Sequence, residues 1–147
     1  MTIVQIPPEL VSAAIKADLD TISNFGVHFG TVGDSDSNAK TIGAPLPYIL
    51  VHMGTSFPDS PRMAGRSGKA LTMRVEHVAA TEDMARSVVL GTRGFLHRRV
   101  VTADDGTAWR IWCDDSADVP VEVDQTWTKP DGGPLFSGID TYTVTRA

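Results

Sequence analysis

The sequence predicts an α+β fold in a single domain, 1–147, with a mixed or antiparallel β-sheet and two main helices packed on one face. Residues 71–101 pass directly from an alternating strand pattern into an amphipathic helical pattern. The other strand-like runs are accompanied by only one more helical stretch, near the N-terminus. Runs of strands interrupted by single helices are typical of α+β domains. The length of 147 residues suits one domain whose core needs neither a metal nor a disulfide.

The composition narrows the class of protein. A net charge of −5 disfavours a chain whose main task is to bind nucleic acid. The single cysteine, Cys113, excludes an internal disulfide framework, and its apolar run AWRIWCDD predicts a small buried side chain. No apolar run approaches the length of a membrane span, and MTIVQIPPEL does not resemble a signal peptide. We therefore expect a soluble protein made in a cytoplasm.

The N-terminal third predicts one helix and two strands. Residues 8–23 begin with a proline that suits a first helical turn, and apolar side chains then recur at helical spacing. Residues 25–32 (FGVHFGTV) predict a short strand, and the polar, turn-rich residues 33–45 predict a loop. Residues 46–55 (LPYILVHMGT) form a nearly continuous apolar run, which is typical of a central strand.

The central unit, residues 71–101, predicts a half-buried strand followed at once by a capped helix. Alternate strand residues are apolar, and Thr81 then stands at an N-cap position before Glu82 and Asp83, whose charge suits a helix N-terminus. The predicted buried helix face consists of Met84, Val88 and Phe95, with Ala85, Val89 and Leu96 beside it. The last turns gather cations that suit the helix dipole, namely Arg93, His97, Arg98 and Arg99.

The C-terminal third predicts strands joined by tight turns. Residues 103–107 (ADDGT) carry an Asp-Gly turn signal. Strands are predicted at 108–114, 119–127 and 136–145 because apolar and polar residues alternate there. The segment 129–134 (KPDGGP) predicts a turn, so the last two strands are expected to pair as a hairpin.

A long polar segment joins two predicted strands at residues 56–68 (SFPDSPRMAGRSG). It shows no buried pattern, and loops of this length inside compact domains are often functional. Exposed arginine, methionine and aromatic side chains are the composition of protein interfaces. We expect a surface that contacts a partner, and the alternative is a solvated hairpin tip with incidental charge. The residues concerned are Phe57, Arg62, Met63, Arg66 and Lys69.

Two histidines lie in a repeated pattern. The sequences VHFGTV and VHMGTS place His28 and His52 in the same His-x-Gly-Thr context. Two-histidine phosphoesterases carry a hydroxyl residue two positions after the histidine. Here the threonine follows three positions after it, so on a strand the two side chains would point to opposite faces. This geometry disfavours an enzyme and favours two solvent-facing strand histidines.

Other signatures of chemistry are absent from the sequence. The four histidines show no His-x₃-His spacing and no Cys-x₂-Cys partner, and no phosphate-binding, dinucleotide-binding or nucleophile-elbow motif occurs. The acidic pairs lie in predicted loops or strand ends, where aspartate favours turns. We therefore predict no catalytic, metal-binding or cofactor-binding residues, and no cofactor.

The whole-chain pattern resembles the tail terminator, or tail completion, proteins of long-tailed bacteriophages. The points of likeness are the N-terminal helix PPELVSAAIKADL, the run PLPYILVHMG, the strand ALTMRVEHVAA with the helix TEDMARSVVLGTRGFLHR, and the final strand GIDTYTVT. The best match is the strand followed by an acidic-capped helix with alanine and arginine in its second turn. The likeness covers nearly the full length, in the order and pattern of elements.

This resemblance implies a structural virion protein without enzymatic activity, located at the head–tail junction and assembled in the bacterial host cytoplasm. Such proteins form a hexameric ring that caps the tail tube, stops its polymerisation and joins the head connector. The implied partners are further copies of the chain, the tail tube protein and the head–tail connector protein, with no membrane. DNA would pass through the lumen without specific binding, and the acidic balance of this chain is consistent with that passage.

Two sets of residues are the expected contacts of such a ring subunit. The loop would contact a neighbouring subunit or the tube. Phe57 and Met63 would be its apolar anchors, and the basic residues Arg62, Arg66 and Lys69 would be polar contacts. The terminal strand 139–145 would bury a sheet edge or extend a neighbour's sheet through Ile139, Tyr142 and Val144. The close alternative is a head-closure or connector protein, and the less favoured one is a small phosphoesterase-like enzyme. A ring subunit needs complementary surfaces, whereas an enzyme needs a concave pocket with convergent polar groups.

Overall fold

The computed structural model describes residues 8–29, 34–36, 41–42, 45–54, 70–114, 120–129 and 131–147. Among these residues, no helix is long and apolar enough to cross a membrane. The elements in chain order are α1 (Pro8–Leu19), β1 (Gly26–Phe29), β2 (Asp34–Asp36), β3 (Thr41–Ile42), β4 (Tyr48–Met53), β5 (Ala70–Ala79), α2 (Glu82–Leu96), β6 (Val100–Thr102), β7 (Ala108–Cys113), β8 (Glu122–Thr128) and β9 (Pro134–Arg146).

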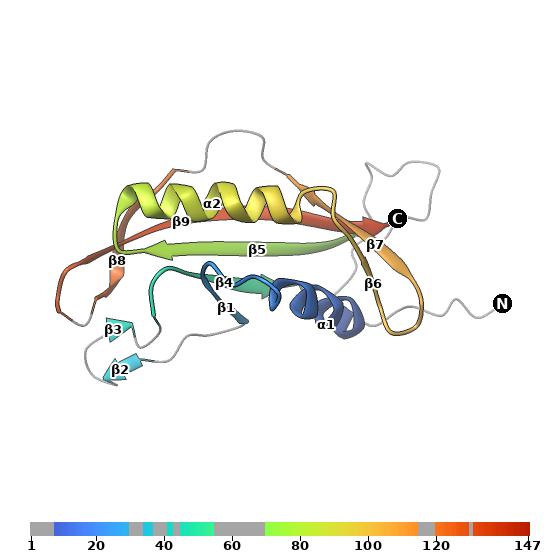
Figure 1. The fold of residues 1–147 in the computed structure, drawn as a ribbon, viewed down its shortest axis with the longest axis horizontal. Coiled ribbons are helices and arrows are strands. Elements are labelled where there is room, and N and C mark those ends of the chain that lie inside the picture. Colours follow the sequence, from blue (N-terminus) through green and yellow to red (C-terminus); the bar gives the residue numbers. More distant parts are fainter. Residues whose placement is uncertain are drawn as a thin grey trace.

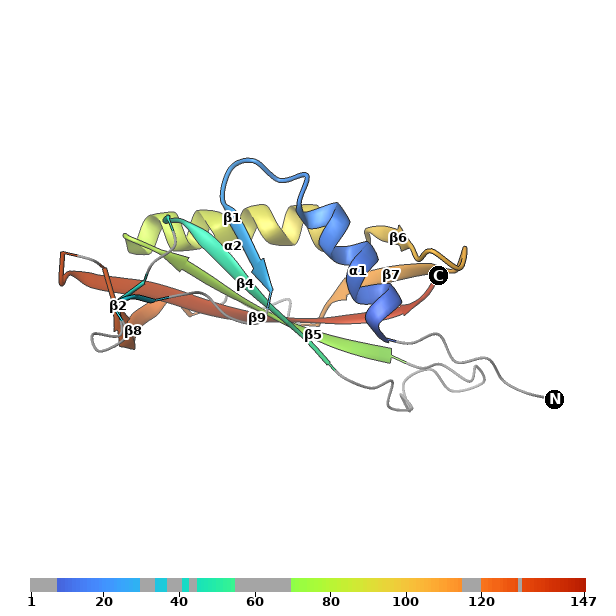
Figure 2. The ribbon, with the colours of Figure 1, turned by 90° about the horizontal axis from the view of Figure 1, so that it is seen from below.

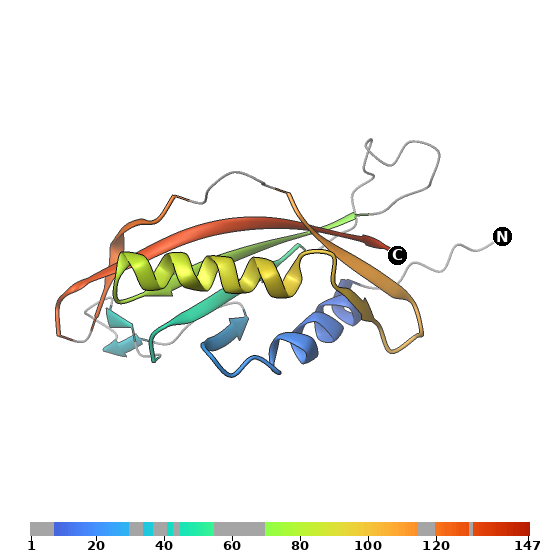
Figure 3. The same cartoon turned by 45° about the horizontal axis from the view of Figure 1, so that its top comes forward.

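The fold is the predicted α+β arrangement, with one mixed sheet and both helices on the same face (Figures 1 and 2). The described strands follow the order β1-β4-β5-β9-β8-β3-β2, and β7 joins β9 to β6. The two long strands β5 and β9 are antiparallel neighbours from Ala70 opposite Thr145 to Ala79 opposite Phe136. Helix α2 lies over these two strands, and α1 packs near β6 (Figure 3).

The alternation predicted for β5 is confirmed. Leu71, Met73 and Val75 are fully buried toward the helices, whereas Thr72 and Arg74 are exposed on the opposite face. Apolar side chains of α1 and α2 complete this core with those of β4, β7 and β9. Its largest contributors include Ile15, Leu19, Ile49, Leu71, Met73, Leu96, Ile111 and Tyr142.

The helix cap is also confirmed, but the buried face of α2 is rotated from the predicted one. The Thr81 hydroxyl accepts a hydrogen bond from the Met84 amide at 3.2 Å, which satisfies a donor of the first turn. Met84 is 42% exposed, because the stripe that faces the sheet is centred one position later. That stripe consists of Ala85, Val88, Val89, Thr92 and Leu96.

Helix α2 ends earlier than the cluster of basic residues suggested. It stops at Leu96, and Arg98 takes a left-handed conformation with φ 67°. The Arg98 amide then donates to the Ile111 carbonyl at 2.7 Å, which turns the chain into β6. The sequence did not predict this short strand, because residues that suit a helix C-terminus are found there.

Other observed elements of the N-terminal third also differ from the predicted ones. α1 ends at Leu19, before residue 23, and the segment predicted as a polar loop contains β2 and β3, which pair with each other antiparallel. These short strands form through backbone pairing that their polar sequence does not signal. The predicted β8–β9 hairpin is confirmed by the pairing of Glu122 with Ser137 and of Val123 with Phe136.

The opposite face of the sheet carries no helix among the described residues (Figure 2). At one end of this open face, Tyr48, Val78 and Leu135 form a small buried cluster. Elsewhere two large side chains remain accessible, with Ile139 50% exposed and Trp112 36% exposed. The open face is therefore partly apolar and accessible.

Candidate functional site

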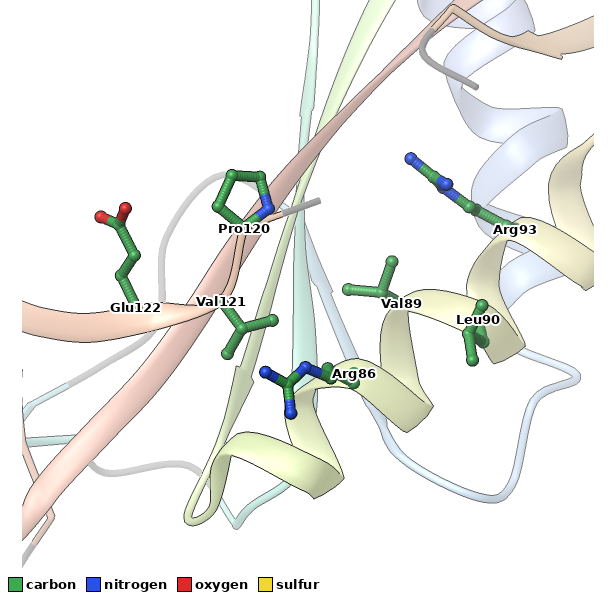
Figure 4. Close-up of a pocket in the computed structure, with 7 residues that line it drawn as sticks. All are labelled: Arg86, Val89, Leu90, Arg93, Pro120, Val121 and Glu122. Atoms are coloured by element: carbon green, nitrogen blue, oxygen red, sulfur yellow. The ribbon is translucent and has the colours of Figure 1, made fainter. Parts of the chain in front are cut away.

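A groove of about 480 Å³ runs between one flank of α2 and the segment that leads into β8 (Figure 4). Apolar and charged side chains both line it. The lining residues are Arg86, Val89, Leu90 and Arg93 from α2 and Pro120, Val121 and Glu122 from the facing segment. Glu122 lies at the rim, with its carboxylate turned away from the helix (Figure 4).

Helical spacing explains why these α2 side chains share one flank. Arg86 and Leu90, like Val89 and Arg93, are four positions apart, so each pair lies one turn apart on the same side. Val89 turns toward the sheet and is 5% exposed, whereas Leu90 is 69% exposed. The groove thus presents an accessible leucine between two arginines.

One residue that lines the groove, Arg93, forms an ion pair with a buried carboxylate. The Arg93 Nε donates to Asp140 Oδ2 at 2.6 Å, and Nη2 donates to Oδ1 at 3.3 Å. The Asp140 side chain is fully buried and that of Arg93 is 19% exposed, so the two-point contact neutralises a carboxylate removed from water. The hydrogen bond to Asp140 raises the pKa of Arg93, which keeps the guanidinium charged.

Two further side chains approach the same carboxylate. The Cys113 Sγ lies 3.7 Å and 3.8 Å from the two oxygens of Asp140, within reach of a weak thiol hydrogen bond. Tyr142 is fully buried two residues along β9, and its pKa is raised by burial first and by the charge of Asp140 second. Cys113 is half-buried and packs against the hydrophobic core beside this charge, so the prediction of a small buried side chain is confirmed only in part.

His77 adds a second polar group to the layer under α2. It is fully buried, and its Nδ1 donates to the Gly138 carbonyl at 3.0 Å if that nitrogen carries the proton. No hydrogen-bond partner for Nε2 is found in the described part of the chain. Burial lowers the pKa of His77, so the neutral imidazole is the favoured form.

The basic residues after α2 are held by specific partners rather than by the helix dipole alone. Arg99 forms an ion pair with Asp18 of α1, and its guanidinium lies 4.1 Å from the centre of the Phe95 ring. The His97 Nδ1 accepts a hydrogen bond from the Cys113 amide at 3.0 Å. Arg98 is exposed.

The loop residues predicted as an interface lie outside the described residues. They are Phe57, Arg62, Met63, Arg66 and Lys69. The strands on either side of the segment, β4 and β5, pair antiparallel from Tyr48 opposite Val78 to Met53 opposite Met73. The segment therefore connects the two strands of a hairpin, as predicted.

The prediction that the terminal strand lies at a sheet edge is wrong. β9 pairs with β5 on one side and with β7 and β8 on the other. Tyr142 and Val144 face the helices and are fully buried, so they cannot contact a neighbour. Ile139 points to the open face and remains 50% exposed.

The two histidines of the repeated pattern lie on adjacent strands of the open face. His28 of β1 packs edge-on against Tyr48, with ring centres 5.4 Å apart, and His52 of β4 lies opposite Arg74 of β5. Burial, and then the charge of Asp124, raises the pKa of the nearby Glu76. Within the described ranges, no three His, Cys, Asp or Glu side chains are placed to hold a metal ion.

Comparisons with known proteins give no family. No family of proteins matches the sequence, and no curated protein matches it. One similar solved structure has 17% sequence identity and a TM-score of 0.46, and the alignment covers 95% of this chain and 96% of that chain. The name of that protein describes no function, and this likeness establishes neither a family nor an activity.

Proposed function

We propose that this protein is a structural virion subunit that caps the tail tube of a long-tailed bacteriophage as a hexameric ring. The ring stops polymerisation of the tube and forms the joint to the head connector. One observation carries the proposal beyond the sequence pattern: accessible apolar side chains occur on both sides of the sheet. Leu90 lines the groove on the helix side, and Ile139 and Trp112 lie on the open face.

Two different accessible surfaces suit a ring. In a closed ring of more than two subunits, each subunit contacts its neighbours through two unlike surfaces that complement each other. The helix side offers a groove lined by apolar and charged side chains, whereas the open face offers β-structure with Ile139 and Trp112. A small enzyme would need convergent polar groups in a pocket. Arg93, which lines the groove, is instead paired with the buried Asp140 of its own chain.

The loop of residues 56–68 completes the proposal. Phe57 and Met63 would anchor the subunit to the tube or to a neighbour, with Arg62, Arg66 and Lys69 as polar contacts. DNA would pass through the lumen without specific binding, which the net charge of −5 supports. A head-closure or connector protein would share the same location and much of this surface chemistry.

A tube polymerisation assay tests the function. Purified tail tube protein is allowed to elongate with and without this protein, and tube lengths are measured by electron microscopy. We expect elongation to stop at capped ends, and a variant with residues 56–68 replaced by a short Gly-Ser linker to cap poorly. Tubes that grow to the same length with and without the wild-type protein would exclude a terminator. Binding to the connector alone would assign the head-closure role instead.

A further inference from the structure

We propose that His77 is an acid-sensitive release for α2: when its imidazole takes up a second proton, the helix separates from the sheet while β5 and β9 stay paired. The release takes place within one subunit, so it does not depend on the proposed ring. It is a local opening of one element rather than a general loss of stability. Because α2 forms one wall of the groove, its separation abolishes the groove.

His77 lies inside the layer between α2 and the sheet. It shares a face of β5 with Val75 and Met73, the face that packs against the helices, and its side chain is fully buried. Its Nδ1 is hydrogen-bonded to the Gly138 carbonyl of β9 at 3.0 Å, and Nε2 has no hydrogen-bond partner among the residues that the structure describes. A second proton would therefore place a charged N–H group where water does not reach.

Two charged side chains of the described chain face His77, one from β9 and one from α2. The charge of Asp140 favours the charged imidazole, and that of Arg93 opposes it. Both oxygens of Asp140 are already engaged, Oδ2 by the Arg93 Nε at 2.6 Å and Oδ1 by the Arg93 Nη2 at 3.3 Å and the Thr141 amide at 3.0 Å. On β4, the position opposite His77 is the apolar Ile49. Asp140 is thus not free to accept a hydrogen bond from a protonated Nε2.

Separation of the helix removes this obstacle to protonation. Burial is the main cause that lowers the pKa of His77 below its usual 6.5 while α2 is in place. Once α2 moves away, water reaches Nε2 and the pKa returns toward that usual value. A state that binds the proton more readily gains population as the pH falls. The open state is therefore rare above about pH 6.5 and increases by up to about tenfold for each pH unit below it, until the folded-state pKa is reached.

Helix α2 is held to the sheet mostly by small side chains, so it is the element that opens first. Its buried stripe contains Ala85, Val88, Val89 and Thr92, and Leu96 is its one large member. The Thr92 hydroxyl donates to the Val88 carbonyl of its own helix at 2.8 Å. The helix also contains two glycines, which lower its intrinsic propensity. By contrast, β5 is paired with β9 along its whole length. Elements with few buried apolar contacts open before such a ladder.

The thiol of Cys113 reports the opening. It is the single cysteine of the chain and lies half-buried beside Asp140, the partner of Arg93. Its reaction with 4,4′-dithiodipyridine, which labels thiols in mild acid, is timed at several pH values and divided by the rate for the urea-unfolded chain. We expect this relative rate to rise about tenfold between about pH 7 and pH 5. His77→Gln retains a donor for the Gly138 carbonyl but takes up no proton, so its relative rate should change less than about twofold.

His97→Gln is the matched control. The His97 Nδ1 accepts a hydrogen bond from the Cys113 amide, so His97 is a histidine beside the reporter itself. Glutamine can accept the same bond, and this variant should keep the full acid response of the wild type. A response that is lost in His97→Gln and retained in His77→Gln would assign the effect to the wrong histidine and overturn the proposal.

Hydrogen exchange of the wild-type protein locates the opening without any variant. Exchange is measured by mass spectrometry and corrected for the intrinsic rate at each pH. Protection of the α2 amides should fall about tenfold between about pH 6.5 and pH 5, whereas protection of the β5–β9 ladder should change less than about twofold. If helix and ladder lose protection together, the event is global unfolding. If the helix keeps its protection, no release occurs. Either result contradicts the proposal.

Discussion

Arg86 and Arg93 form ion pairs from the same flank of α2, yet they should differ greatly in importance. The Arg86 side chain is 56% exposed, and an exposed pair contributes little. Arg93 is 19% exposed and compensates a fully buried carboxylate. Removing one partner of a buried pair leaves the other charge uncompensated, which costs far more than the pair contributes.

The first prediction compares these two arginines. Arg93→Met should lower the free energy of unfolding by about 3 kcal/mol, because Asp140 is left buried and unpaired. Arg86→Met should lower it by less than about 0.5 kcal/mol. Urea denaturation of both variants measures the difference. Equal losses would contradict the assignment of Arg93 as the structural arginine.

The second prediction concerns His77 and acid. Burial lowers the pKa of His77 below its usual 6.5, so the unfolded chain binds the proton more readily than the folded one. The stabilisation is therefore complete above about pH 6.5 and is lost as the pH falls toward the folded-state pKa. His77→Gln retains a donor for the Gly138 carbonyl but cannot be protonated. Its stability should fall less than that of the wild type between about pH 7 and pH 5 in urea titrations. If the free energy of unfolding falls equally with pH in the two proteins, His77 does not cause the loss of stability in acid.

The third prediction concerns the left-handed conformation of Arg98. Glycine has no penalty in the left-handed region, so Arg98→Gly should raise the free energy of unfolding by about 1 kcal/mol. Thermal unfolding of the purified variant measures the change. A variant that melts at a lower temperature than the wild type would contradict the left-handed conformation of Arg98.

Local interactions could be predicted at the residue scale, and distant ones could not. The Thr81 cap depends on residues within one turn, so its pattern is visible in the sequence. Arg93 pairs with Asp140, 47 positions away, and Arg99 pairs with Asp18, 81 positions away. The sequence does not indicate which of its many carboxylates each arginine contacts. The basic cluster after α2 was therefore ascribed to the helix dipole alone.

At the scale of elements, periodicity predicted the type of each long element but not its neighbours. The alternation of β5 and β9 indicates one buried face for each strand, and both are confirmed. Alternation does not say which strands flank a given strand, so β9 was taken for an edge although it lies inside the sheet. The residues at which α1 and α2 end could not be predicted, because backbone hydrogen bonds and packing with distant residues set them.

The fourth prediction follows from the interior position of β9. Tyr142 pairs with Met73 of β5 and with Cys113 of β7. Tyr142→Pro removes a ladder donor and a buried ring from a central strand, so it should cost well over about 3 kcal/mol and prevent folding. Tyr142→Phe keeps the ring and should fold. Circular dichroism melts of the soluble fractions check both, and a native-like melt of the proline variant would refute the interior placement.

At the scale of the whole molecule, the fold class was predicted correctly and the groove was not. Two periodic helices and several alternating runs suffice to indicate an α+β sheet with one covered face. The groove combines α2 with a segment some thirty positions later, so only the folded chain brings Leu90 and Val121 together. Ile139 was selected from the sequence, and it is accessible on the open face, although for a different reason than a strand edge.

The ring itself is tested most directly by negative-stain electron microscopy of the purified chain, alone at high concentration and mixed with tail tubes. We expect closed six-fold rings with a central hole wide enough for duplex DNA, and the same rings seated on tube ends. Single subunits in both samples, with bare tube ends, would exclude the ring.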